Sequence, residues 1–81
     1  MTKEEIIAKI NFFLAKEFEI DENLIFPDAI LRDTLSLDSL DYVDLVVIIE
    51  SNFNIKVQQG DFQNIITFMN LYDYILTSMN Y

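Results

Sequence analysis

The stretch that decides the fold is DSLDYVDLVVIIESNF, residues 38–53. At 100° per residue, its apolar side chains form one broad helical stripe, which we assign to the core. That stripe consists of Tyr42, Leu45, Val46, Ile49 and Phe53. The opposite side of the helix carries Leu40, Asp44, Val47 and Ser51, flanked by Asp41 and Val43. Because short polar residues cap helix starts, we predict a helix over residues 39–52 that begins at Ser39.

A second amphipathic helix is predicted upstream, over residues 3–18. Thr2 and Glu5 have the spacing of a capping box, in which the hydroxyl and the carboxylate each accept a hydrogen bond from a free backbone N–H. The apolar face of this helix consists of Ile6, Ile7, Ile10, Phe13, Leu14 and Phe18.

The segment between these two helices reads as a long loop. Over residues 19–38 the periodicity fades and the only proline, Pro27, appears, with a short helical turn expected near residues 28–32. A loop of this length needs anchors on the core. The apolar candidates are Leu24, Ile25, Phe26, Ile30, Leu31, Leu35 and Leu37.

The rest of the chain supplies two shorter elements. We expect one short helical turn at residues 61–65 and a last helix at residues 67–79, capped by Thr67. The apolar repeat of this last helix is Phe68, Leu71, Tyr72, Ile75 and Met79. The predicted fold is therefore all-α: a small four-helix bundle in one domain over residues 1–81, with a long loop after the first helix and a short third helix.

The composition limits the possible functions. Eighty-one residues with no Cys and no His exclude a large enzyme, a disulfide framework, a thiolate metal site and the usual proton shuttle. With 14 acidic and 5 basic residues, the net charge of -9 repels nucleic acid and anionic membranes and favours basic partners. The sequence shows neither a membrane-spanning apolar run nor a signal peptide, so we expect a cytoplasmic protein. We also expect it to be a monomer.

Acidic and apolar side chains are mixed on the helix at residues 39–52. The helix contains Asp41, Asp44 and Glu50, and Asp38 comes directly before it. No Lys or Arg occurs between Arg32 and Lys56. Such acids often form only a solvated face that favours the helix dipole. Here Leu40 and Val47 lie among them, which favours a docking site for a basic partner.

Ser39 is the side chain whose possible chemical role is most important to weigh. It cannot act alone as a nucleophile, because a serine hydroxyl needs an adjacent base and the chain has no His. Two roles stay open: a helix cap, or a surface hydroxyl that another enzyme modifies. Backbone N–H groups at a helix start would stabilise a phosphate attached there.

The string LSLDSLD at residues 35–41, the acidic-apolar helix at residues 42–50 and the string FNIKV at residues 53–57 together resemble an acyl carrier protein. The resemblance covers nearly the whole chain. It implies that a phosphopantetheinyl transferase esterifies Ser39 with 4′-phosphopantetheine from coenzyme A, next to Asp38. The thiol of this arm would hold acyl intermediates as thioesters, so the protein itself would be a non-catalytic carrier.

The resemblance also implies partners and a shelter for the cargo. The expected partners are acyl synthases, reductases and acyltransferases of fatty acid or related acyl-chain biosynthesis. Their basic patches would contact Asp41, Asp44 and Glu50, and Leu40 and Val47 would offer apolar contacts beside these acids. The candidate lining of an acyl pocket is Leu45, Val46, Ile49, Phe53, Phe68 and Tyr72.

The chain departs from the family pattern at two places. Fatty-acid carriers commonly have Gly where this chain has Ser36, and a side chain there disfavours a positive φ. The run QQGDFQ at residues 58–63 lacks the usual Pro and several acids, and its Phe62 adds an apolar contact.

Three alternatives stay open at this point. A peptidyl carrier usually has a Gly-Gly-His/Asp-Ser pattern before its site, and D-alanyl carriers favour Met where Leu40 stands. An acidic helical adaptor that carries no cofactor is the third. No metal site is expected, because the acids lack the spacing of a calcium loop.

The charge imbalance predicts that added salt or divalent cations raise the melting temperature, because they screen repulsion among nine uncompensated negative charges. Thermal melts followed by circular dichroism from low to moderate salt test this expectation. An unchanged melting curve would contradict it.

Overall fold

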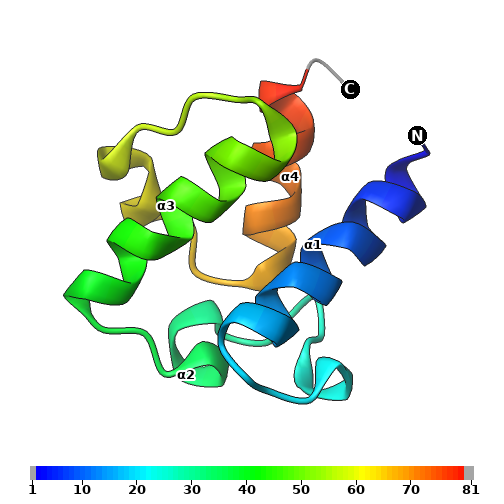
Figure 1. Ribbon diagram of the computed structural model, residues 1–81, viewed down its shortest axis with the longest axis vertical. Helices are drawn as coiled ribbons and strands as arrows, with labels where there is room; N and C mark the ends of the chain where they lie inside the picture. The colour runs from blue at the N-terminus through cyan, green and yellow to red at the C-terminus, as the bar shows by residue number, and fades with distance from the viewer. Residues whose placement is uncertain (1, 80–81) are drawn as a thin grey trace.

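The computed structural model describes residues 2–79 and consists of helices joined by loops (Figure 1). Its elements in chain order are α1 (Lys3–Glu17), η1 (Glu22–Leu24), α2 (Leu31–Leu35), α3 (Ser39–Phe53), η2 (Gln59–Asn64) and α4 (Phe68–Ser78). The all-α prediction is confirmed, and the three long helices end within two residues of their predicted bounds. Met1, Asn80 and Tyr81 of the predicted domain lie outside the described residues.

The three long helices enclose the core, and in the view of Figure 1 α4 lies behind α3. Phe13 of α1 meets Phe53 of α3 with ring centroids 5.7 Å apart, and the Tyr72 hydroxyl of α4 donates a hydrogen bond to Asn11 of α1. The side chains with no solvent exposure include Ile6, Ile10, Leu14, Leu45, Ile49, Phe68, Leu71 and Ile75. Each contributes about 1.5–3 kcal/mol by burial.

The predicted core stripe of α3 is only partly buried. Leu45, Ile49 and Phe53 are buried, whereas Tyr42 and Val46 are half-buried. The difference arises because α1 and α4 cover only one side of α3, and the short η2 faces the edge where Tyr42 and Val46 lie.

Two of the helix caps were predicted correctly. Thr2 and Glu5 exchange the two hydrogen bonds of a capping box, each 3.1 Å long. Thr67 caps α4 in the same manner with Asn70 as its partner. These reciprocal bonds satisfy backbone N–H groups that a helix start leaves free.

The long loop between α1 and α3 is fastened to the start of α4 by backbone hydrogen bonds. Leu31 N donates to Ile66 O at 2.9 Å, and Met69 N donates to Pro27 O at 2.8 Å. An isolated antiparallel bridge joins Ile30 and Thr67 between them. The helical turn predicted near residues 28–32 therefore begins later, at Leu31, because residues 27–29 form a turn closed by the hydrogen bond from Ala29 N to Phe26 O, and Ile30 is extended.

The predicted loop anchors divide into two groups. Ile25, Leu31, Leu35 and Leu37 are buried, as predicted, whereas Leu24, Phe26 and Ile30 are exposed. Ile25 and Ile30 have extended backbone, in which successive side chains point in opposite directions, so Phe26 and Ile30 face outward. Leu24 is exposed at the end of η1. For the three exposed residues the anchor prediction was wrong.

The third helix is a 3₁₀ helix that begins at Gln59, two residues before its predicted start. Its position depends on polar contacts from the helices on either side. The Glu50 carboxylate of α3 accepts a hydrogen bond from Val57 N at 2.8 Å, and the Tyr74 hydroxyl of α4 donates to Asp61 at 2.8 Å.

None of the helices within residues 2–79 has the length and apolar content that a membrane crossing requires.

Ser36 ends α2 in the left-handed conformation, with φ 55° and ψ 48°. Its backbone N–H donates to Arg32 O, which closes the last turn of α2 just before the start of α3. A residue with a Cβ adopts this conformation at a cost of about 1–2 kcal/mol, which glycine does not incur.

We predict that Ser36→Gly raises the free energy of unfolding by about 0.5 kcal/mol, because relief of this strain exceeds the entropy that glycine adds to the unfolded chain. Ser36→Val should lower it by about 1 kcal/mol, because a β-branched side chain tolerates positive φ poorly. Ser36→Ala keeps the Cβ and serves as the control. Urea denaturation measures all three, and equal stabilities of the Gly and Val variants would contradict the prediction.

Candidate functional site

The start of α3 is fixed by a capping box between Asp38 and Asp41. Asp38 Oδ1 accepts hydrogen bonds from Leu40 N and Asp41 N, both at 3.0 Å. Asp41 Oδ2 accepts one from Asp38 N, also at 3.0 Å. The helix therefore has its N-cap at Asp38, and Ser39 is its first helical residue.

The hypothesis that Ser39 caps the helix was wrong, because the carboxylate of Asp38 reaches the N–H groups that a serine cap would serve. Ser39 is exposed, and the cap does not require its hydroxyl. The N–H groups of Leu40 and Asp41, two of those expected to stabilise an attached phosphate, are likewise occupied by Asp38. The helix start thus holds an exposed primary hydroxyl on a rigid backbone.

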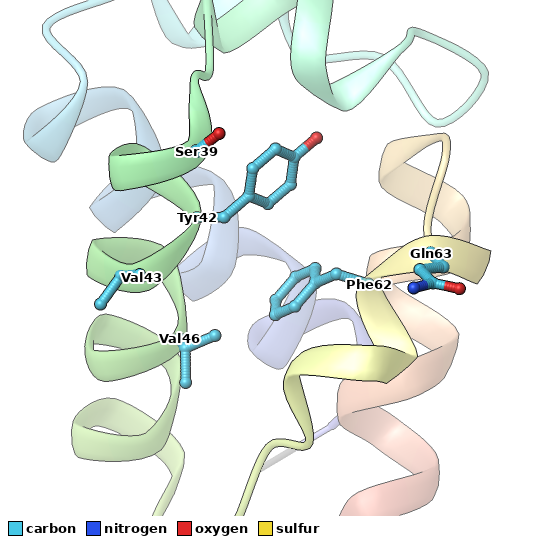
Figure 2. Close-up of a pocket in the computed structure, with 6 residues that line it drawn as sticks. All are labelled: Ser39, Tyr42, Val43, Val46, Phe62 and Gln63. Atoms are coloured by element: carbon cyan, nitrogen blue, oxygen red, sulfur yellow. The ribbon is translucent and has the colours of Figure 1, made fainter.

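An apolar groove of about 310 Å³ lies beside this hydroxyl, between α3 and η2 (Figure 2). Tyr42 projects into it from α3 and Phe62 from η2, with ring centroids 5.8 Å apart and an interplanar angle of 61°. The complete lining is Ser39, Tyr42, Val43, Val46, Phe62 and Gln63. A group attached to Ser39 would begin at the edge of this groove.

The predicted acyl-pocket residues are placed in two environments. Val46 lines the groove, whereas Leu45, Ile49, Phe53, Phe68 and Tyr72 belong to the buried core. For these five residues, a role in lining an acyl pocket stays a prediction.

The sequence reasoning missed Tyr42, Val43, Phe62 and Gln63 as lining residues. A usable signal was present for the first two, because residues three, four and seven positions after Ser39 share its helix face. That rule selects Tyr42, Val43 and Val46, all of which line the groove. Phe62 and Gln63 have no such signal, since their place depends on how η2 folds back against α3.

The predicted partner-binding residues share the α3 helix but differ in what they contact. Leu40 and Val47 are 76% and 55% exposed, and Asp44 is exposed beside them. Asp41 contributes to the capping box, and Glu50 binds Val57 N. Within residues 2–79, Asp44 is therefore the acid of this face whose side chain makes no hydrogen bond or ion pair with the rest of the protein.

The η2 wall of the groove is held in place from α4. Tyr74 donates its hydroxyl hydrogen to Asp61 Oδ2 at 2.8 Å and accepts a hydrogen bond from Gln58 N at 3.4 Å. Burial, reinforced by the bond to Asp61, raises the pKa of the Tyr74 hydroxyl, which favours its protonated, donating form. Phe62 therefore faces α3 from a wall that is held to α4 at Gln58 and Asp61.

The residues present fit a covalently attached phosphopantetheine. The exposed Ser39 hydroxyl offers an accessible oxygen for a phosphodiester, and the adjoining groove is mostly apolar in its lining. When bound, the group supplies a terminal thiol that this Cys-free chain lacks.

Comparison with known proteins gives a consistent result. A family model described as a phosphopantetheine attachment site matches residues 9–75, a region that includes Ser39. An acyl carrier protein of Thermotoga maritima is 38% identical over 91% of both chains, and one of Rubrobacter xylanophilus is 33% identical over 94% of both. A third, from Lactobacillus johnsonii, is 32% identical over 99% of this chain and 100% of the relative.

The matches extend over nearly the whole chain and agree with its all-helical structure. The chain therefore belongs to the acyl carrier protein family, whose members are non-catalytic carriers with a covalently attached 4′-phosphopantetheine.

Proposed function

We propose that Ser39 carries the 4′-phosphopantetheine and that the protein delivers acyl thioesters to enzymes of fatty acid or related acyl-chain biosynthesis. The observation that carries this proposal is the exposed Ser39 hydroxyl, left out of the helix cap by Asp38 and adjacent to an apolar groove. The phosphodiester would form on the Ser39 oxygen, and the cargo would be held on the thiol of the arm. The protein would act there as a monomeric, cytoplasmic carrier.

Partner enzymes would dock on the outward face of α3. Leu40 and Val47 offer exposed apolar contacts, and Asp44 supplies negative charge between them. Basic patches on a phosphopantetheinyl transferase, a synthase, a reductase or an acyltransferase complement this combination. Asp41 and Glu50 remain part of the proposed surface, but substituting them would also remove hydrogen bonds that support the fold.

The proposed attachment predicts one phosphopantetheine per chain. After incubation with coenzyme A, magnesium and a broad-specificity phosphopantetheinyl transferase, intact mass spectrometry should show a single addition. Ser39→Ala should show none and should keep its fold, because the Asp38 cap does not use the serine side chain.

Two results would argue against this proposal. An addition that persists in Ser39→Ala would place the attachment elsewhere. A folded wild-type protein that gains no mass, even with several transferases, would favour the adaptor function over the carrier function.

The proposed docking face predicts that Asp44→Lys slows transfer onto Ser39 by roughly threefold to tenfold at low salt, because a basic enzyme surface meets a reversed charge. Asp73→Lys on α4 is the matched control, since it makes the same charge change at an exposed position of another helix. Initial rates of transfer measure both variants. Equal slowing would indicate an effect of net charge alone, and added salt should reduce any specific difference.

A further inference from the structure

A second cavity adjoins the groove beside Ser39. It has a volume of about 240 Å³ and is lined in part by Ile30, Arg32, Ile65 and Ile66. Its remaining lining residues, Tyr42, Phe62 and Gln63, are shared with the groove. The two spaces therefore meet at the Tyr42–Phe62 pair.

The two aromatic rings lie across this junction from opposite walls. Tyr42 belongs to the same helix face as Ser39, one turn further along α3, and Phe62 approaches from η2 (Figure 2). Their edge-to-face contact, with centroids 5.8 Å apart, leaves the rings in the preferred geometry of an aromatic pair. Both side chains also pack on the core, which limits their freedom to swing away.

The walls that carry the rings are themselves fixed. The Tyr74–Asp61 hydrogen bond holds η2 to α4, and the bond from Val57 N to Glu50 holds the preceding connection to α3. A cargo that needs more room must therefore displace the rings, because moving the walls would break these polar contacts.

From this placement we infer that Tyr42 and Phe62 form a gate that sets the length of acyl chain the protein shelters. The inference rests on attachment at Ser39. A short chain entering from Ser39 fills the groove along Val43 and Val46 and stops at the aromatic pair. The second cavity beyond the pair, where isoleucines and the Arg32 side chain form the lining, receives a longer chain only when one ring is absent or displaced.

The test compares chain-length dependence in the wild type and in Phe62→Ala. Each protein is loaded with acyl-phosphopantetheine from a series of acyl-coenzyme A donors, from acetyl to palmitoyl, by a broad-specificity transferase. Intact mass confirms loading before the melting temperature is measured. Each sheltered methylene is expected to raise the melting temperature by a few degrees, because it is removed from water in the folded state only.

In the wild type, the melting temperature should stop rising at an intermediate chain length. In Phe62→Ala the rise should continue to longer chains, because the second cavity becomes accessible. Phe12→Ala is the matched control, since it removes the same ring from an exposed position on α1 and should keep the wild-type limit. Tyr42→Ala removes the other ring of the gate and should extend the limit as Phe62→Ala does.

Several outcomes would overturn the inference. A wild-type melting temperature that rises steadily up to palmitoyl would show that no gate exists. An unchanged limit in both Phe62→Ala and Tyr42→Ala, or in the folded one if the other fails to fold, would show that these rings do not set it. If both alanine variants unfold, Phe62→Leu replaces them, because it removes the ring but keeps an apolar side chain. An unchanged chain-length limit in Phe62→Leu would then overturn the inference. A failure to load is seen separately in the mass spectrum and would count against attachment at Ser39.

Discussion

The capping box between Asp38 and Asp41 is the interaction on which the rest of the site depends. It satisfies two N–H groups with one carboxylate and fixes the residue at which α3 begins. A cap of this kind contributes about 1 kcal/mol, which is modest for the fold as a whole. Its larger consequence is geometric: the Ser39 hydroxyl is left outside the cap, and Tyr42, one turn later, is aimed at η2.

Other acids near the groove also form hydrogen bonds that support the fold. Glu50 and Asp61 accept hydrogen bonds from Val57 N and the Tyr74 hydroxyl, and these bonds hold the wall that faces α3. An excess of acidic residues therefore does not translate directly into a partner surface. Part of the negative charge organises the protein itself, and Asp44 is left facing outward between apolar side chains.

Local signals were sufficient to predict the long helices. Periodicity of 3.6 residues placed α1, α3 and α4, and the Thr2–Glu5 pair marked the start of α1 because a capping box is complete within four residues. The exposed Phe26 and Ile30 were mispredicted because their direction depends on backbone pairing with residues 66–69, which are distant in the sequence. The groove was missed for the same reason: one wall, η2, is placed by contacts with Tyr74 and Glu50 rather than by its own pattern.

The division of α3 between core and groove explains how one helix serves both stability and cargo. Leu45, Ile49 and Phe53 recur every four residues and are buried, whereas Val46, one position after Leu45, and Tyr42, one turn before Val46, line the groove that η2 closes. Because a single residue step rotates the helix face by about 100°, neighbouring positions can belong to different environments. Side chains of the groove lie outside the set of fully buried residues, so a change in their size alters the room for cargo more than it alters the core.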